Sequence, residues 1–305
     1  MSVSKLESLQ RLGLGTVQFG LPYGISNTVG VTPLHEISGI LAYAQECGVE
    51  VLDTAVAYGD SESVLGSSLS ESHSFRIVTK LPSCGEVDLS STVDGMEQSV
   101  KASLGRLNQR ELYGVLFHDV SCLLSDRGEA LWGSLVRVKE KGLVSKIGVS
   151  VYSPVEAERI MERYAPDILQ IPVNVLDQRF LAQGHVHELK RAGVEIHARS
   201  CFLQGLLLMD PDTLHPFFEP VRGLLREFRQ ACRDNALSPV EAALGFALSQ
   251  RELDVVLVGV NSLGQLREIV ESAGELRPVE QGCYERFSIG LQEIVEPWRW
   301  PDMSN

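Results

Sequence analysis

Residues 49–69 read VEVLDTAVAYGDSESVLGSSL and contain a complete strand-loop-helix unit. The segment 49–53 is a largely apolar run that ends in Asp53, as is typical of a strand in a sheet covered on both faces. The loop carries Gly59, and the segment 62–69 then has the spacing of an amphipathic helix. Because parallel strands need a crossover connection, this unit indicates an α/β fold.

The same unit recurs along the whole chain. The expected strands lie at 12–16, 49–53, 75–80, 112–118, 146–151, 168–172, 194–198 and 255–258. Helix-period segments between them lie at 33–47, 62–69, 92–107, 128–141, 154–164 and 181–191. Helix starts are indicated where a hydroxyl residue precedes proline, at Thr32, Ser153 and Ser238. C-terminal stops are indicated at Gly48, Gly142 and Gly193.

This order predicts one (β/α)8 barrel, a TIM barrel, as a single domain over residues 1–305, because no composition break interrupts the alternation. A doubly wound dinucleotide-binding fold is the rival. Its fingerprint needs G-x-G-x-x-G opening directly into a helix, whereas Gly13, Gly15 and Gly20 are spaced too widely. We expect the segment 203–226 to be an extended loop and 278–305 to be a C-terminal tail that packs on or covers the barrel.

Composition limits the partners and the compartment. The 305 residues include 27 Lys and Arg against 40 Asp and Glu, a net charge of −13, which repels nucleic acid and anionic lipid. No apolar stretch reaches the roughly 18 residues of a membrane span. The six cysteines show no metal-ligand spacing, so we expect reduced thiols, no metal site and a cytoplasmic location.

Three of the expected strands end at or next to an ionisable residue. Asp53, Lys80 and His118 stand at or next to the strand ends, and Tyr58 follows Asp53 in the loop. The C-terminal strand ends of such a barrel form its pocket, so we expect these four side chains to converge. An ammonium lowers the pKa of a neighbouring phenol, and a carboxylate offsets the cost of burying that ammonium. The set suits a general acid for carbonyl reduction or a general base for alcohol oxidation.

The motif D-T-A-x-x-Y-G-x-S-E-x-x-L-G is matched at every fixed position over residues 53–66. With further matches from about residue 11 to about residue 272, the chain resembles the aldo/keto reductases, NAD(P)H-dependent oxidoreductases built on a (β/α)8 barrel. The resemblance implies that Asp53, Tyr58, Lys80 and His118 are the catalytic residues, with Tyr58 as the acid or base. It also implies that the nicotinamide cofactor binds before the substrate.

The resemblance further implies cofactor contacts at Thr16, Ser150, Gln170, Arg199 and Ser200. Ser150 and Gln170 match the partners of the nicotinamide carboxamide, while Val151 replaces a family Asn. Arg199 stands where an aromatic residue usually stacks on the nicotinamide. A guanidinium can stack as well, or it can bind a substrate carboxylate or sugar hydroxyl, and both roles stay open.

After the last expected strand, residues 259–269 resemble the family's adenosine-phosphate clamp. The implied contacts are Gly259, Asn261, Ser262, Gln265 and Glu268. A helix N-terminus there favours phosphate. Asn261 stands where Lys or Arg is common, and Ile269 replaces the adenine-binding Asn, although Arg267 lies nearby. We expect NADPH as cofactor, with NADH as the alternative.

The expected function is the reduction of an aldehyde or ketone, a small-molecule carbonyl, with Tyr58 as general acid. Polar residues expected in the substrate pocket, Gln18, Tyr23 and Asn174, favour a hydroxylated substrate. The opening 14–27 resembles a bacterial subgroup associated with sugar and surface-polysaccharide metabolism. Two alternatives stay open: a cofactor-binding redox-sensor subunit with little turnover, and a sugar dehydrogenase that works in the oxidative direction. The oligomeric state is left open.

Overall fold

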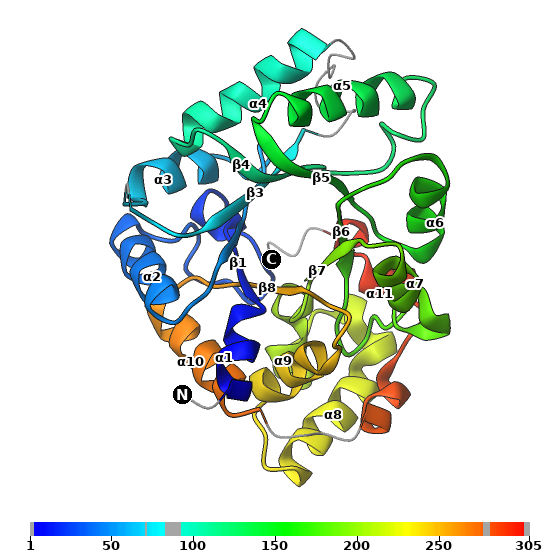
Figure 1. The fold of residues 1–305 in the computed structure, drawn as a ribbon. Coiled ribbons are helices and arrows are strands. Elements are labelled where there is room, and N and C mark those ends of the chain that lie inside the picture. Colours follow the sequence, from blue (N-terminus) through cyan, green and yellow to red (C-terminus); the bar gives the residue numbers. More distant parts are fainter. Residues whose placement is uncertain (1–2, 71, 83–92, 277–280, 302–305) are drawn as a thin grey trace.

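Eight parallel strands pair in chain order and close into a barrel, because β1 also pairs with β8. The structure is a computed structural model, and it describes residues 3–70, 72–82, 93–276 and 281–301. Figure 1 shows the ring of strands with helices around it. The strands are β1 (Leu12–Gly15), β2 (Val51–Asp53), β3 (Arg76–Leu81), β4 (Leu112–Phe117), β5 (Val144–Ser150), β6 (Ile168–Pro172), β7 (Glu195–Arg199) and β8 (Val255–Gly259). The prediction of a single-domain (β/α)8 TIM barrel is confirmed.

Helices alternate with these strands and form the outer layer. The α-helices are α1 (Val3–Gln10), α2 (Leu34–Glu46), α3 (Ser61–Ser68), α4 (Val93–Leu107), α5 (Gly128–Glu140), α6 (Pro154–Arg163), α7 (His185–Arg191), α8 (Glu219–Asp234), α9 (Pro239–Ser249), α10 (Leu263–Gly274) and α11 (Gln292–Val295). The 3-10 turns are η1 (Val17–Phe19), η2 (Ala182–Gly184), η3 (Leu203–Leu208), η4 (Pro211–Thr213), η5 (Pro216–Phe218), η6 (Gln281–Cys283), η7 (Glu285–Phe287) and η8 (Pro297–Arg299).

Two helix boundaries differ from the predictions. The expected helix 181–191 is interrupted, because Gln183 has φ 58° and Gly184 has φ 81°, so the α-helix begins only at His185. Thr32 does not cap α2; Pro33 occupies that position in an extended conformation without a side-chain bond. Ser153 and Ser238 do cap α6 and α9, each through a backbone N–H three residues on.

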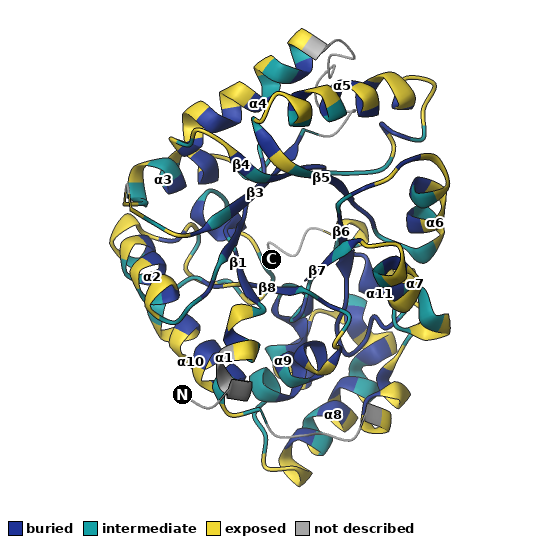
Figure 2. Cartoon of the chain, viewed as in Figure 1, coloured by how far each residue is buried: buried dark blue, intermediate teal, exposed yellow. Residues whose placement is uncertain are grey.

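The apolar core has two parts. A small cluster fills the barrel interior: Val51, Val78, Leu116, Ile168, Val255 and Leu257. A larger cluster lies between the barrel and the inner faces of the helices. In Figure 2 the strands are mostly dark blue and the outward helix faces mostly yellow, as expected for amphipathic helices packed on a parallel sheet.

A polar network occupies the barrel near the beginnings of the strands. The Glu195 carboxylate, at the start of β7, accepts a hydrogen bond from Tyr113 Oη at 2.7 Å and pairs with Lys146. Its other oxygen lies 2.7 Å from Nε2 of His197, whose side chain is buried. Catalytic candidates lie at the opposite ends of the strands, so the apolar cluster separates two polar layers.

Candidate active site

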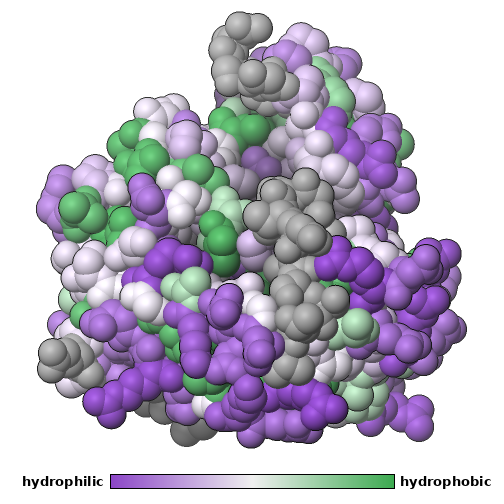
Figure 3. Space-filling model, turned by 90° about the horizontal axis from the view of Figure 1, so that it is seen from above, coloured by the Kyte–Doolittle hydropathy of each residue, from purple (hydrophilic) through white to green (hydrophobic). Residues whose placement is uncertain are grey.

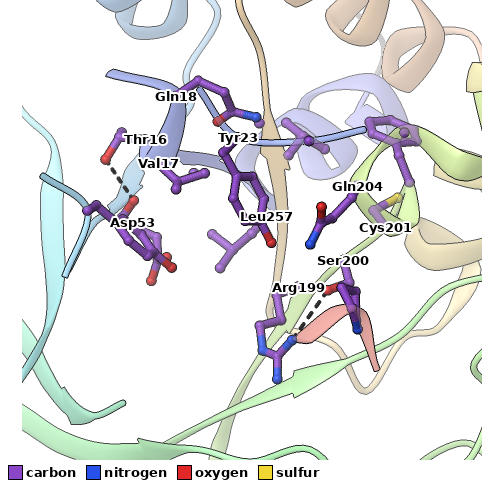
Figure 4. Close-up of a pocket in the computed structure, with 18 of the residues that line it drawn as sticks. Thr16, Val17, Gln18, Tyr23, Asp53, Arg199, Ser200, Cys201, Gln204 and Leu257 are labelled. Carbon is purple, nitrogen blue, oxygen red and sulfur yellow. Dashed lines mark hydrogen bonds between the residues drawn. The ribbon is translucent and has the colours of Figure 1, made fainter. Parts of the chain in front are cut away.

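A cavity of about 510 Å³ opens at the C-terminal ends of the strands. Its wall is built by loops that follow β1, β2, β4, β5, β7 and β8, and by Trp298 near the C-terminus. Figure 4 shows Asp53 on one side and Arg199 with Ser200 on the other. The predicted site residues that line it are Thr16, Gln18, Tyr23, Asp53, Tyr58, His118, Ser150, Gln170, Arg199, Ser200, Gly259, Asn261, Gln265 and Glu268.

Asp53 and Lys80 form a buried ion pair beneath this cavity. Lys80 Nζ lies 2.5 Å from Asp53 Oδ1 and donates a second hydrogen bond to the carbonyl oxygen of Thr54 at 3.0 Å. The Lys80 side chain is only 1% exposed. Burial lowers the pKa of Lys80, and the Asp53 carboxylate opposes that effect. The pair therefore fixes the position of the ammonium.

Tyr58 lies above the ion pair. Lys80 Nζ is 3.5 Å from Tyr58 Oη, at the long limit of a hydrogen bond. Burial raises the pKa of the phenol, and the Asp53 carboxylate raises it further. The expected lowering of this pKa is therefore wrong, because burial and the Asp53 carboxylate outweigh the opposing charge of Arg199. Tyr58 carries its proton at neutral pH.

His118 lies beside the phenol. Its ring packs edge-on against the Tyr58 ring, with 5.8 Å between the centroids. Burial lowers the pKa of the imidazole to about 4, and the charges of Lys80 and Arg199 add to this effect. His118 Nδ1 is buried without a hydrogen-bond partner among the described residues. The ring is therefore neutral at pH 7 and has a free ring nitrogen.

Two of the residues predicted to bind cofactor also support Asp53. Gln170 Nε2 donates a hydrogen bond to Asp53 Oδ2 at 2.7 Å. Thr16 Oγ1 donates to the backbone carbonyl of Asp53 at 3.0 Å and lies 2.9 Å from Ser61 Oγ. The carboxylate is thereby held from two strands besides its own, β3 and β6.

Arg199 ends β7 on the opposite wall. Its Nη2 donates to the Val151 carbonyl at 3.2 Å, and its Nη1 donates to Ser200 Oγ at 3.3 Å. The guanidinium carbon lies 4.1 Å from the centroid of the Tyr152 ring. The Tyr152 ring in turn packs against Trp298, with centroids 3.9 Å apart. An aromatic pair from the loop after β5 and from the C-terminal segment thus holds the guanidinium in place.

The loop after β8 and the start of α10 form the far end of the cavity. Ser262 caps α10 by accepting from the backbone N–H of Gln265 at 3.3 Å. The Gln265 side chain turns back to accept from the Asn261 N–H at 2.7 Å. Asn261 Nδ2 donates to the carbonyl of Gly30 at 3.3 Å. Arg267 lies instead over the Tyr43 ring, at 5.5 Å, and does not line the cavity.

The sequence profile of the Aldo/keto reductase family matches residues 11–281 of this chain. The chain belongs to the aldo/keto reductase family. D-arabinose 1-dehydrogenase of Saccharomyces cerevisiae is 26% identical over 291 residues, covering 86% of each chain. L-galactose dehydrogenase of Arabidopsis thaliana is 24% identical over 301 residues, covering 89% of this chain and 92% of the relative.

Solved structures agree on the fold of this aldo/keto reductase. An aldo-keto reductase from Bacillus halodurans in its holo form superposes with a TM-score of 0.75 at 20% identity, covering 95% of each chain. A putative aldo-keto reductase from Pseudomonas aeruginosa gives 0.65 at 22% identity, covering 87% of this chain and 90% of the other. At such identities the likeness establishes the barrel and its topology.

Aldo/keto reductases are oxidoreductases that use nicotinamide cofactors, and the cavity fits such a group. Gln18 and His118 line the cavity, and each has a buried polar atom, Oε1 and Nδ1 respectively, without a hydrogen-bond partner among the described residues. A Cβ at Gly259 would lie 2.6 Å from Gln18 Nε2, so the end of the Gln18 side chain lies directly against this glycine where the two loops meet. The N-terminus of α10 favours negative charge, and here the Glu36 carboxylate accepts from the Leu263 backbone N–H at 2.7 Å.

Three predicted site residues do not line the cavity of this aldo/keto reductase. Lys80 lies beneath it, and Ser262 is used as the cap of α10. Asn174 is fully buried elsewhere, where its Oδ1 accepts from the backbone N–H groups of Leu176 and Asp177 at 2.9 Å each. The Asn174 side chain therefore shapes a turn after β6, away from the substrate pocket for which it was predicted.

Other lining residues were not selected from the sequence. Tyr152 directly follows the Ser150-Val151 strand end, so its position was a signal that sequence reasoning passed over. Gln204 and Gly205 reach the cavity because η3 contains left-handed residues, with φ 53° and 92°. Gly205 is a local signal for such a bend, because glycine favours a positive φ, but the left-handed Gln204 beside it has no such signal.

The thiols and possible metal ligands add little to the site. Cys201 lines the cavity, and burial raises its pKa to about 12, so the thiol stays protonated. Cys122 is disulfide-bonded, which corrects the expectation of six reduced thiols.

Within the ranges that the structure describes, no group of three or more His, Cys, Asp or Glu could hold a metal ion. No helix of those ranges is long and apolar enough to cross a membrane.

Proposed function

We propose that this aldo/keto reductase reduces the aldehyde or ketone carbonyl of a sugar or sugar-derived substrate to an alcohol. The observation that carries the proposal is the chain of contacts from Asp53 through Lys80 to Tyr58, with His118 edge-on to the phenol. Bound NAD(P)H would supply the hydride. The other parts of the reaction, proton donation and stabilisation of the charge that develops, are carried out by side chains of this protein.

Tyr58 is the proposed general acid. Its Oη holds a proton at neutral pH and donates it to the carbonyl oxygen while the carbonyl carbon accepts the hydride. The carbonyl π bond breaks, and C–H and O–H bonds form, so the atoms and electrons balance. The Lys80 ammonium, 3.5 Å from Oη, stabilises the phenolate that remains. Asp53 positions that ammonium, and neutral His118, edge-on to the phenol in the cavity lining, orients the substrate oxygen.

A sugar-like substrate is supported by two observations. The relatives from yeast and Arabidopsis are named for D-arabinose and L-galactose. The cavity also carries polar side chains away from Asp53: Ser200 and Gln204 lie on the opposite side, and Tyr23 lies between that side and Asp53. Such groups can hydrogen-bond hydroxyls without adding charge.

We further propose that NADH is accepted at least as well as NADPH, although the sequence resemblance favoured NADPH. An extra phosphate on the ribose needs a cation, and Asn261 supplies none. Arg267 is engaged with Tyr43 outside the cavity, and Glu268 adds a negative charge to the lining. Among the described lining residues, the α10 end of the cavity therefore has no cation to pair with the extra phosphate on the ribose.

The oxidative direction is the second candidate function. Both named relatives are dehydrogenases of sugars, and the same side chains serve when the proton flows from a sugar hydroxyl to the Tyr58 phenolate. The raised pKa of Tyr58 favours the acid form, and so favours reduction near pH 7. Initial rates in both directions across pH decide between the two.

The test is turnover with NADH and with NADPH on a panel of small aldehydes and aldoses, for the wild type and Tyr58→Phe. We expect the wild type to turn over and Tyr58→Phe to lose at least roughly a hundredfold in kcat, because only the transferable proton is removed. Cofactor affinity, measured by calorimetry, should be unchanged. Tight cofactor binding by the wild type without turnover on any carbonyl would instead support a redox-sensor role.

A further inference from the structure

The Arg199 guanidinium carries a charge that nothing in the cavity neutralises. Its contacts are a backbone carbonyl, the Ser200 hydroxyl and the Tyr152 ring, all of them uncharged. Among the residues that the structure describes, no carboxylate lies within ion-pair distance of it. A half-buried cation of this kind is costly unless an anion comes to meet it.

The other charges of the lining do not serve that purpose. Asp53 is already paired with Lys80 at 2.5 Å and also accepts from Gln170. Glu268 belongs to α10, at the other end of the cavity. Figure 4 shows Asp53 and Arg199 on opposite sides of the cavity. The reacting end of the cavity therefore has an excess of positive charge in a protein whose net charge is −13.

The guanidinium is held ready for a ligand. A guanidinium has five N–H donors, and only two are used, toward Val151 and Ser200. The Tyr152 ring covers one face at 4.1 Å, and Trp298 supports that ring from behind. Fixing the side chain in advance reduces the entropy lost on binding. The remaining donors suit a planar carboxylate or a phosphate.

We propose that Arg199 forms an anion subsite and that the physiological substrate is a hydroxylated carbonyl compound with a carboxylate or phosphate group. This inference rests on the proposed function, because the anion must lie on the molecule that Tyr58 protonates. Arg199, Tyr58 and His118 all line the same cavity, so the subsite opens onto the space that holds the reacting atoms. Arg199 is then a specificity-determining residue.

The experiment compares kcat/KM for D-glucose, D-glucuronate and D-glucose 6-phosphate, which present a neutral, a carboxylate and a phosphate substrate. The variants are Arg199→Gln and Arg199→Lys, with Arg286→Gln as the matched control. Arg286 also lies over an aromatic ring, Phe287, but is exposed outside the cavity. We expect the wild type to prefer one of the two anionic sugars over glucose. The preferred sugar shows whether the subsite binds a carboxylate or a phosphate.

Arg199→Gln should lower kcat/KM for that sugar by roughly tenfold to a hundredfold more than kcat/KM for glucose, since charged hydrogen bonds to the anionic group are lost. Arg199→Lys should retain part of the preference, and Arg286→Gln all of it. Calorimetry on Tyr58→Phe, which blocks the chemistry, should show the same order of sugar affinities.

Two results would overturn the inference while leaving the proposed function intact. One is turnover of all three sugars without an anion preference. The other is a loss of NADH affinity in Arg199→Gln with an unchanged ratio between anionic and neutral sugars, which would assign the guanidinium to the cofactor. Absence of turnover on every carbonyl tested would count against the proposed function itself.

Discussion

Burial sets the protonation states of the ionisable side chains in the cavity. It raises the pKa of Tyr58 and lowers the pKa values of Lys80 and His118, and neighbouring charges only modify these shifts. Burial favours the neutral form of each group, which for Tyr58 and His118 is also the form that donates or shares a proton in a reduction.

His118 should stay neutral across the physiological range. Its pKa lies near 4 instead of 6.5, so its imidazole NMR shifts should hardly move between about pH 5.5 and pH 8. Because the unfolded chain binds a proton more readily than the folded one, this group contributes to stability above pH 6.5, and the contribution is lost as pH falls toward 4. A titration midpoint near 6.5 in the folded protein would contradict the burial of this ring.

Asn261→Arg should create the cation that the α10 end of the cavity lacks. We expect roughly tenfold tighter binding of NADPH and little change for NADH, because one charged hydrogen bond to phosphate is added. Calorimetric titration of both nucleotides measures this. Asn235→Arg adds the same charge at the exposed C-terminus of α8 and should change neither affinity. An equal effect of both variants would place the phosphate elsewhere.

The sequence was sufficient to predict which residues stand at the strand ends. It was not sufficient to predict how deeply each side chain is buried or which side chains surround it. The spacing placed Asp53, Tyr58, Lys80 and His118 together because parallel strands end on one side of a barrel. The pKa direction of Tyr58 was wrong because burial of a loop residue depends on segments remote in sequence. The Arg199 stack was missed for the same reason, since Trp298 reaches Tyr152 from the C-terminus.

Among the elements, the loops that follow β1 and β2 lie close together around Gly20. A Cβ at that position would lie 1.9 Å from the Tyr58 carbonyl oxygen and 2.6 Å from the Ser61 backbone nitrogen. Both are backbone atoms, which cannot give way as a flexible side chain can. The loop that carries Tyr58 is therefore seated directly on the loop that follows β1.

Gly20→Ala should displace the Tyr58 loop. We expect a loss of roughly 2 kcal/mol in the free energy of unfolding and a fall in kcat larger than the change in cofactor affinity. Urea unfolding and initial rates measure the two effects. Gly105→Ala is the matched control, because nothing lies near that position in the exposed face of α4 and alanine there should stabilise by about 0.5–1 kcal/mol.

The order and approximate length of the helices and strands were predicted from the sequence more accurately than the residues at which they begin and end. All eight strands overlap the predicted segments because apolar runs and their spacing reflect burial on both faces. The N-terminal helix α1 was not predicted, and neither was the break at Gln183. The long helix α8 occupies part of the block 203–226, which was expected to be loop. Its apolar stripe was overlooked because many charges interrupt it.

At the scale of the whole molecule, polar side chains lie in separate layers, one on the surface and one inside the barrel. Hydrophilic side chains cover much of the face in Figure 3, with apolar ones in separated groups. Inside the barrel, Glu195 joins Tyr113, Lys146 and His197 across strands β4, β5 and β7. Although burial acts to raise its pKa, the bonds from His197, Lys146 and Tyr113 hold it at about 2.

Glu195→Gln should destabilise the whole barrel. A carboxylate with a folded pKa near 2 and an ordinary value of 4.5 contributes stability above pH 4.5, and this is lost as pH falls toward 2. We expect a loss of roughly 3 kcal/mol at pH 7 and a flatter dependence of stability on pH below 4.5. Glu219→Gln removes an exposed ion pair with Arg222 and should cost less than about 1 kcal/mol. Comparable losses for both variants would show that the buried network adds nothing.

The position of Trp298 makes its fluorescence a probe of ligand binding in the cavity. Trp132 is buried between Phe117 and Tyr164, and Trp300 donates its indole N–H to the Ile294 carbonyl at 3.0 Å. Of the three tryptophans, Trp298 alone lines the cavity, and it is 52% exposed. Its emission reports on whatever enters the cavity, and a Trp298→Phe variant removes that signal while the other two indoles continue to report the fold.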